Sequence, residues 1–269
     1  MNVLTVLWAE TYKELIESRR YTLNLALSII VQTIIFMGIL FLAVSFSPIR
    51  TPEAVARTAE VKSFLLIGYI VWTFAMFAVN NMGQDVTTEM VLGTFEQKYM
   101  ASVSPVVVLA GRALGNVVVS VIYTGVLLPV LILISGVRLS IPWTVFPVLG
   151  VTLVGLYGLG YILAGMALLF KRVGQASYAV QLVLLFFGGF TNPGEAGGVV
   201  GGFSRALPLT PGVEVIRSLV LDGARLGSLV STGAVTRLLV NAAAYLAVGL
   251  AVFCLCDRVA RRRGCIGKY

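Results

Sequence analysis

The sequence predicts an all-α integral membrane protein that forms one transmembrane domain over residues 1–269, with six transmembrane helices. Hydrophobic residues make up 58% of the chain and charged residues only 12%. A soluble domain carries about 25% charged residues, so this chain has too little polar surface to cover a globule in water. The apolar residues also gather into long stretches, most of them near the roughly 20 residues that a helix needs to cross a bilayer.

The first element, residues 1–21, is predicted to be an interfacial helix. Apolar residues such as Leu4, Trp8 and Tyr12 share one helical face, and charged residues such as Glu10 and Lys13 share the other. A helix with this pattern lies on the membrane surface with its apolar face in the lipid. We therefore place it before the first membrane span.

Six apolar stretches follow as predicted membrane spans: Leu23–Phe46, Ser63–Met82, Leu109–Ser135, Val145–Phe170, Gln175–Phe190 and Leu238–Cys256. The fifth is short for a full crossing and ends in two glycines, so its outer end stays open. No Asp, Glu, Lys or Arg lies in the middle of a predicted span. Arg112 lies near one end of the third span, where its side chain is expected to reach the lipid headgroups.

The basic residues predict that both termini are cytoplasmic. With this orientation, the inner segments hold twelve of the twenty Lys and Arg residues, including the Lys171-Arg172 loop and the cytoplasmic tail, residues 257–269. An excess of Lys and Arg in short loops marks the cytoplasmic side of a membrane protein. The net charge of +8 is therefore explained by membrane flanks, and no nucleic-acid partner is expected.

The segment from 84 to 104, between the second and third spans, has an amphipathic pattern. The apolar residues fall within one arc of a helical wheel and the acids and amides on the opposite side: Val91, Leu92, Phe95 and Tyr99 against Glu89, Glu96 and Gln97. Gly93 is expected to kink the chain, and Ser104-Pro105 to start the next helix. Two interpretations remain open. The segment is an interfacial helix that presents polar groups to a soluble partner, or a solvated connector.

The segment from 191 to 237, between the fifth and sixth spans, is rich in glycine and then carries helix-start signals. Thr210 is expected to cap a helix that begins at Pro211, with Glu214 near its positive end. Glu214 and Arg217 are three residues apart and are expected to pair. This favours broken or re-entrant half-helices packed against protein at the outer surface. The alternative is an ordinary outer loop with one surface helix.

Signals for catalysis are absent from the sequence. It contains no phosphate-binding loop G-x-x-x-x-G-K-[ST], no G-x-S-x-G nucleophile motif and no histidine. The three cysteines, near the C-terminus, have neither zinc spacing nor a disulfide framework. We therefore expect no catalytic residue, metal or cofactor on this chain.

Two motifs carry a resemblance to a known family. The first is Gly93-Thr94-Phe95-Glu96-Gln97, followed by Ser104-Pro105 and Gly111-Arg112. The second is Pro208-Leu209-Thr210-Pro211, followed by Glu214, Arg217 and Gly223. Together with the N-terminal helix and the six-span layout, they resemble the membrane subunit of ABC exporters of the ABC-2 type.

The resemblance implies a permease without catalytic activity that works with separate subunits. Two copies of the chain, or this chain and a similar one, would form the pathway, and two ABC ATP-binding subunits would bind ATP and Mg. The cytoplasmic coupling helix would use the residues Glu89, Gly93, Thr94, Phe95, Glu96, Gln97, Lys98 and Tyr99. The N-terminal helix would be a second contact. The outer re-entrant segment would include Pro208, Thr210, Pro211, Glu214 and Arg217.

The resemblance also implies where the cargo passes. The first, second and fifth spans would line the pathway, with the apolar candidates Met37, Phe41, Trp72, Met76, Phe186 and Phe187. No charged lining is seen in the sequence, so a hydrophobic or amphiphilic cargo (drug, lipid or lipid-linked glycan) is expected, moved outward across a plasma membrane.

Two other classes of protein compete with this hypothesis. A stand-alone secondary transporter or channel is the first, and charges within the membrane or inverted repeats would favour it. A membrane-embedded enzyme acting on lipid is the second, and it would need a convergent cluster of carboxylates or histidines. Neither kind of signal is found in the sequence.

Overall fold

The protein is all-helical in the part of the chain that the structure describes. The computed structural model describes residues 3–20, 22–45, 52–93, 104–170, 172–190 and 197–263, and within these ranges it contains no strand. This confirms the all-helical part of the predicted fold class.

Five helices are long and apolar enough to cross a membrane, so the chain is a multi-pass membrane protein. They are α2 (Thr22–Ser45), α3 (Pro52–Val91), α5 (Pro105–Ser135), α6 (Val145–Phe170) and α11 (Ala234–Arg263). The N-terminal helix α1 (Val3–Arg20) precedes them. Five of the six predicted spans lie within these helices to within one residue at each end.

The second and fifth spans need closer description. The helix α3 continues past the predicted span end at Met82, so Asp85 and Glu89 belong to a membrane helix and not to a connector. The predicted fifth span corresponds to α7 (Gly174–Val183) and the π-helical η1 (Leu184–Phe190), an apolar unit shorter than the other five. Its shortness agrees with the sequence.

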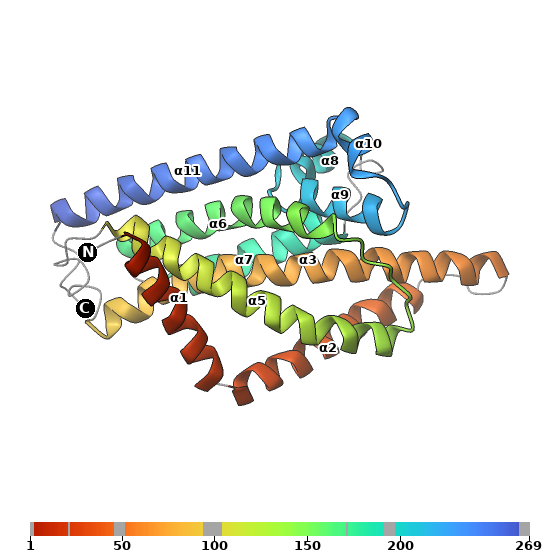
Figure 1. Cartoon of the computed structure of the whole chain (residues 1–269), viewed down its shortest axis with the longest axis horizontal. Helices are drawn as coiled ribbons and strands as arrows, with labels where there is room; N and C mark the ends of the chain where they lie inside the picture. Colours follow the sequence, from red (N-terminus) through yellow and green to blue (C-terminus); the bar gives the residue numbers. More distant parts are fainter. Residues whose placement is uncertain are drawn as a thin grey trace.

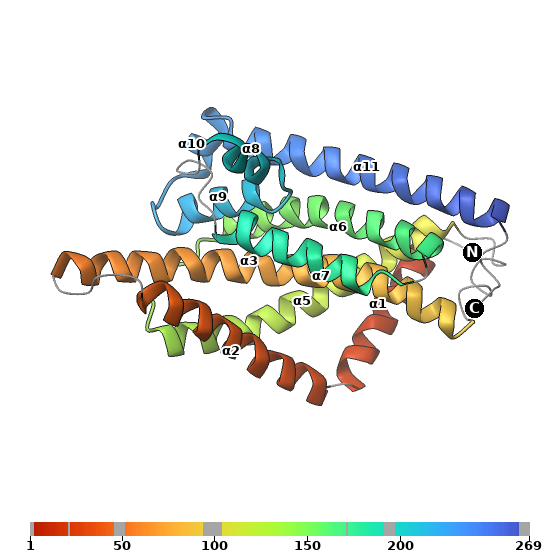
Figure 2. The same cartoon turned by 180° about the vertical axis from the view of Figure 1, so that it is seen from behind.

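The long helices run side by side as an elongated bundle (Figures 1 and 2). At one end α1 begins, α3 ends and α5 begins, and we call this the connector end (Figure 1). At the opposite end lie three short helices, α8 (Gly198–Ala206), α9 (Thr210–Val220) and α10 (Leu226–Ser231). We call this the α9 end.

Small residues bring the helix backbones together. A methyl group on Gly158 of α6 would collide with the backbone of Tyr245 in α11, and one on Gly249 of α11 would collide with the backbone of Gly158. In a membrane the hydrophobic effect does not drive helices together, so close backbone packing of this kind is a main source of association. The α6–α11 pair is therefore a tightly packed part of the bundle.

The surface of the bundle is apolar. On α2 most of the large side chains are exposed, among them Leu23, Leu27, Ile34 and Phe41. On a soluble protein a continuous apolar surface of this size would be unusual. Here it faces lipid or another protein subunit.

Candidate functional site

A buried ionic cluster joins α1, α3 and α5 at the connector end. Arg112 of α5 is only 1% exposed. Its Nε donates to Oε2 of Glu10 on α1 at 3.2 Å, and its Nη2 donates to Oε1 of Glu89 on α3. A buried charge is tolerated when it is paired and hydrogen-bonded, and Arg112 satisfies both conditions. The cluster thus ties together three helices that are distant in sequence.

Lys13 of α1 completes the cluster. Its Nζ lies 3.4 Å from Oε1 of Glu89 and 3.7 Å from Oε1 of Glu17. The Glu89 carboxylate therefore binds a cation from α5 and another from α1. This placement corrects two expectations, because Glu89 is buried and does not face a soluble partner, and Arg112 does not reach toward the lipid headgroups.

Glycines on α5 allow α1 to approach this closely. A methyl group on Gly111 would lie 3.1 Å from the Cα of Leu7, and one on Gly115 would lie 2.7 Å from the Cβ of Glu14. The Thr11 hydroxyl donates to the Gly111 carbonyl at 3.1 Å. Glycines four residues apart form a groove along one face of a helix. This groove holds α1 in the register that brings Glu10 to Arg112.

Burial changes the acidity of Glu14, the next acid on the same face of α1. It raises the pKa of Glu14 from 4.5 to about 7, and the carboxylate of Asp85 on α3 adds to the effect. Arg112 and Lys13 act in the opposite direction without cancelling it. The junction of α1, α3 and α5 therefore contains more acidic side chains than its basic side chains neutralise.

The predicted coupling residues lie beside this cluster. Gly93 takes a positive φ of 70°, which confirms the expected break in the helix and favours glycine at this position. Val91 and Leu92 are exposed, while Glu89 is buried. A helix that packed its apolar face on protein would show the opposite arrangement. The remaining predicted residues, Thr94, Phe95, Glu96, Gln97, Lys98 and Tyr99, lie outside the described residues.

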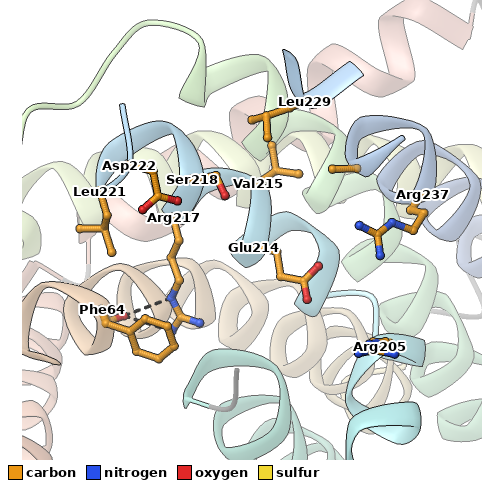
Figure 3. Close-up of a pocket in the computed structure, with 11 residues that line it drawn as sticks. Phe64, Arg205, Glu214, Val215, Arg217, Ser218, Leu221, Asp222, Leu229 and Arg237 are labelled. Carbon is orange, nitrogen blue, oxygen red and sulfur yellow. Dashed lines mark hydrogen bonds between the residues drawn. The ribbon is translucent and has the colours of Figure 1, made fainter. Parts of the chain in front are cut away.

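A second buried arginine, Arg217 of α9, lies at the opposite end of the molecule. Its guanidinium donates to the carbonyl of Phe64 on α3, with Nη2 at 3.1 Å, and to the carbonyl of Gly189 on η1. The guanidinium carbon also lies 3.3 Å from the centre of the Phe64 ring (Figure 3). Burial lowers the pKa of Arg217, but a guanidinium remains charged at neutral pH.

Arg217 borders a cavity of about 480 Å³ at the α9 end. Glu214 and Asp222 also line it, together with Arg205 and Arg237 (Figure 3). The predicted Glu214–Arg217 salt bridge is not among the contacts of the described residues, since Arg217 binds the two carbonyls instead. The expectation of a pair between residues three apart considers one helix alone, whereas the Arg217 side chain points away from α9 and toward Phe64 of α3.

The helix-start signals before α9 are confirmed with one correction. The helix begins at Thr210, with Pro211 in its first turn, as Pro favours. Thr210 is inside the helix and its buried hydroxyl has no hydrogen-bond partner within the described residues, so it does not cap the helix. Pro208 and Pro211 are buried against the bundle.

The structure divides the predicted pathway residues into two groups. Trp72 is buried and its indole N–H donates to the Gln181 carbonyl at 2.9 Å, while Met76 accepts a hydrogen bond from the Gln32 amide. These two hold α3 against its neighbours. The others lie at or near the surface: Met37, Phe41 and Phe186 are exposed, and Phe187 is partly buried against Phe203.

Sequence reasoning missed the ionic cluster. A matched spacing was present, because Gly111 and Gly115 are four residues apart on one segment and Glu10 and Glu14 are four apart on another. Equal spacing of this kind is compatible with packing between the two helix faces, but it does not show that the two helices are in contact.

Comparisons with known proteins agree with the motifs in the sequence. The model of the family described as "ABC-2 type transporter" matches residues 3–221, which is most of the chain. No curated protein matches the chain.

Proposed function

Because the chain belongs to the ABC-2 type transporter family, we propose that it forms the export pathway of an ATP-driven transporter as a dimer with two separate ATP-binding subunits. The family places it as an ABC transporter permease, a class that normally pairs with such subunits. The ATP and Mg would be bound by the partner. The proposal concerns how this chain receives their movement and what it carries.

The ionic cluster around Arg112 is the observation that carries the proposal. Glu89 lies just before the connector of residues 94–103, and Arg112 lies just after it. Their contact holds the two helices that flank the connector together, and the contact of Arg112 with Glu10 attaches α1 to the same unit. A push on the connector would therefore move α1, α3 and α5 together, since packed helices respond as rigid bodies.

The contacts with the ATP-binding subunit are proposed to come from the polar part of the connector. Glu96, Gln97 and Lys98 supply charges and amides in a row, in the interval between α3 and α5. Glu89 has a different role in this proposal, because its burial keeps it from a soluble partner. It would anchor the connector and leave the docking to its neighbours.

The proposed orientation places the connector end in the cytoplasm and the α9 end outside. The clustering of Lys and Arg on the predicted inner segments supports this. With α7 and η1 as a short fifth span, the chain would cross the membrane six times. The helices α8 and α9, packed against η1 and α3 at the outer end, would then form the re-entrant segment.

The proposed cargo is hydrophobic or amphiphilic. The exposed apolar side chains of α2, including Met37 and Phe41, offer a surface on which a second permease copy and an apolar cargo could meet. Trp72 and Met76, which form hydrogen bonds with Gln181 and Gln32, lie on the neighbouring helix α3.

The test is association with the ATP-binding subunit after charge reversal in the connector. The detergent-extracted complex from the native host would be captured through a tag on this chain, and the co-purified proteins identified by mass spectrometry. We expect a protein with a phosphate-binding loop to co-purify, and Glu96→Arg to reduce its yield about tenfold or more, as loss of a charged docking contact does. The control is Glu60→Arg, at an exposed position near the other end of α3.

Equal recovery of the ATP-binding subunit by the wild type and Glu96→Arg would contradict the docking role. A pure homo-oligomer without any such subunit would contradict the proposed function and favour a stand-alone carrier.

A further inference from the structure

A second cavity lies between α1, α2, α3 and α5, on the side of the ionic cluster away from the connector. Its volume is about 330 Å³, within the range of small-molecule sites. The helices α1 and α2 extend away from the other long helices at an angle to each other (Figures 1 and 2). All four helices contribute lining residues, for example Glu14, Leu25, Phe77 and Asn116.

One wall of this cavity is acidic. Glu14 and Glu17 line it directly, and Glu14 makes no salt bridge within the described residues. The described groups that act on Glu14 are Asp85 of α3, Arg112 of α5, and Glu17 and Lys13 of α1. Both cations are already engaged, Arg112 by Glu10 and Glu89 and Lys13 by Glu17 and Glu89. The Glu14 carboxylate is thus positioned to bind a cation, and no basic side chain of the described residues forms a salt bridge with it.

The helix α5 adds polar groups to the same lining. The side-chain oxygen of Asn116 accepts from Asn81 at 2.8 Å, and its amide nitrogen lies beside the Asp85 carboxylate. The Tyr123 hydroxyl has no hydrogen-bond partner within the described residues. Asn116 is 1% exposed and Tyr123 4%. Unpaired groups at this depth destabilise the protein unless a ligand or water binds them.

The rest of the lining is apolar. Leu25, Met76, Phe77 and Val119 supply hydrocarbon and ring surface next to the polar groups. A cavity for water alone would need only the polar wall, whereas the apolar wall gives a hydrocarbon group a place to pack.

We propose that this cavity binds the head of an amphiphile that carries an ammonium group and a neighbouring hydroxyl or carbonyl, such as an amino alcohol. The ammonium binds Glu14, the oxygen binds the Tyr123 hydroxyl, and the hydrocarbon packs on Phe77 and Met76. This deepens the proposed function, because it names the class of cargo on which that function would act. It adds a charged contact, which the sequence did not suggest, to the hydrophobic or amphiphilic cargo that the sequence favours.

The test measures binding to the full chain alone, reconstituted in phosphatidylcholine nanodiscs. Radiolabelled N-dodecylethanolamine is the probe, and the ethylene glycol monododecyl ether is its neutral counterpart with the same chain and hydroxyl. After subtraction of binding to empty discs, we expect the amine to bind about tenfold tighter than the ether, because only the amine forms a charge-assisted hydrogen bond.

Two variants locate the binding site. Glu14→Gln is expected to weaken the amine about tenfold and leave the ether unchanged, since it removes the charge and keeps the shape. Tyr123→Phe is expected to weaken both probes about threefold through loss of one hydrogen bond. The matched controls are Glu60→Gln and Tyr178→Phe, at exposed positions outside the cavity. Unchanged thermal unfolding verifies that each variant is folded.

Equal affinity for the two probes, or full amine binding by Glu14→Gln, would overturn the proposed ammonium site. Full binding of both probes by Tyr123→Phe would overturn the recognition of the oxygen.

Two further arms distinguish the source of the ligand. Displacement of the probe by phosphatidylethanolamine in the discs would assign the site to a bilayer lipid. Stimulation of ATP hydrolysis by the probe in the complete complex would assign it to the cargo, and either result supports the site. Because binding is measured on the permease alone, loss of the ATP-binding partner would contradict the proposed function without affecting this test.

Discussion

In the described part of the chain, each end of the bundle buries one arginine, and different groups stabilise the two guanidinium charges. At the connector end, Arg112 is paired with the carboxylates of Glu10 and Glu89. At the α9 end, Arg217 binds the carbonyls of Phe64 and Gly189 and packs on the Phe64 ring. Arg112 is thus paired with fully charged carboxylates, whereas Arg217 contacts only the partial charges of carbonyl oxygens and an aromatic ring.

The difference has consequences for how each end responds to change. Removal of one member of a buried ion pair leaves an opposite charge buried alone, which is strongly destabilising. Removal of Arg217 leaves only carbonyl groups without a partner, and these are cheaper to bury. The connector end is therefore expected to be the more sensitive of the two, as suits the end that receives mechanical force in the proposed function.

The largest expected effect is that of Arg112→Met. It removes the buried cation that Glu89 binds, and should lower the free energy of unfolding by about 3–5 kcal/mol. Unfolding in mixed micelles would measure it. The exposed Arg138→Met is the control, and addition of Glu89→Leu should recover part of the loss because it removes the stranded charge. A double variant no better than Arg112→Met would contradict the ion-pair account.

A smaller effect is expected for Arg217→Met. The loss of two carbonyl contacts and the cation–π contact should lower the free energy of unfolding by about 2 kcal/mol. The same titration would measure it, with Arg225→Met at a nearby exposed position as the control. A loss equal to that of Arg112→Met would show that the two ends do not differ as described.

The smallest effect is a pH dependence confined to the connector end. The folded-state pKa of Glu14, about 7, is raised above its ordinary value of 4.5, so its contribution to stability is full below pH 4.5 and is lost as the pH rises through 7. Because Glu14 is partly exposed, the loss should be about 1 kcal/mol. Protection of α1 from proteolysis between pH 5 and 8 would report it. Glu14→Gln should remove the dependence and Glu60→Gln should retain it.

The sequence was sufficient for the elements of each end but not for their contacts. Pro105 and Pro211 marked the starts of α5 and α9 because Pro fits the first turn of a helix, and Gly93 marked the end of α3 because it accepts a positive φ. The extent of α3 was underestimated, since Glu89 looked too polar for a membrane helix until its contacts with Lys13 on α1 and Arg112 on α5 were known.

The partners themselves could not be predicted because they are distant in sequence. Arg112 lies 102 residues from Glu10, and helical periodicity shows which face of a helix is apolar but not which helix packs on it. Arg217 was even less predictable, because one of its acceptors is a carbonyl in the π-helical η1, whose geometry has no clear sequence signal.

The most direct test of the central claim is the number of cargo molecules moved per ATP hydrolysed by the reconstituted complex that carries Arg112→Met with Glu89→Leu. This pair of changes removes the contacts that Arg112 makes with α1 and α3, and it does not leave Glu89 as a buried unpaired charge. The account predicts that the ATP-binding subunit still binds and hydrolyses ATP, while transport per ATP falls about tenfold or more as the coupling is lost. Unchanged transport per ATP would contradict the claim that the buried cluster transmits the movement.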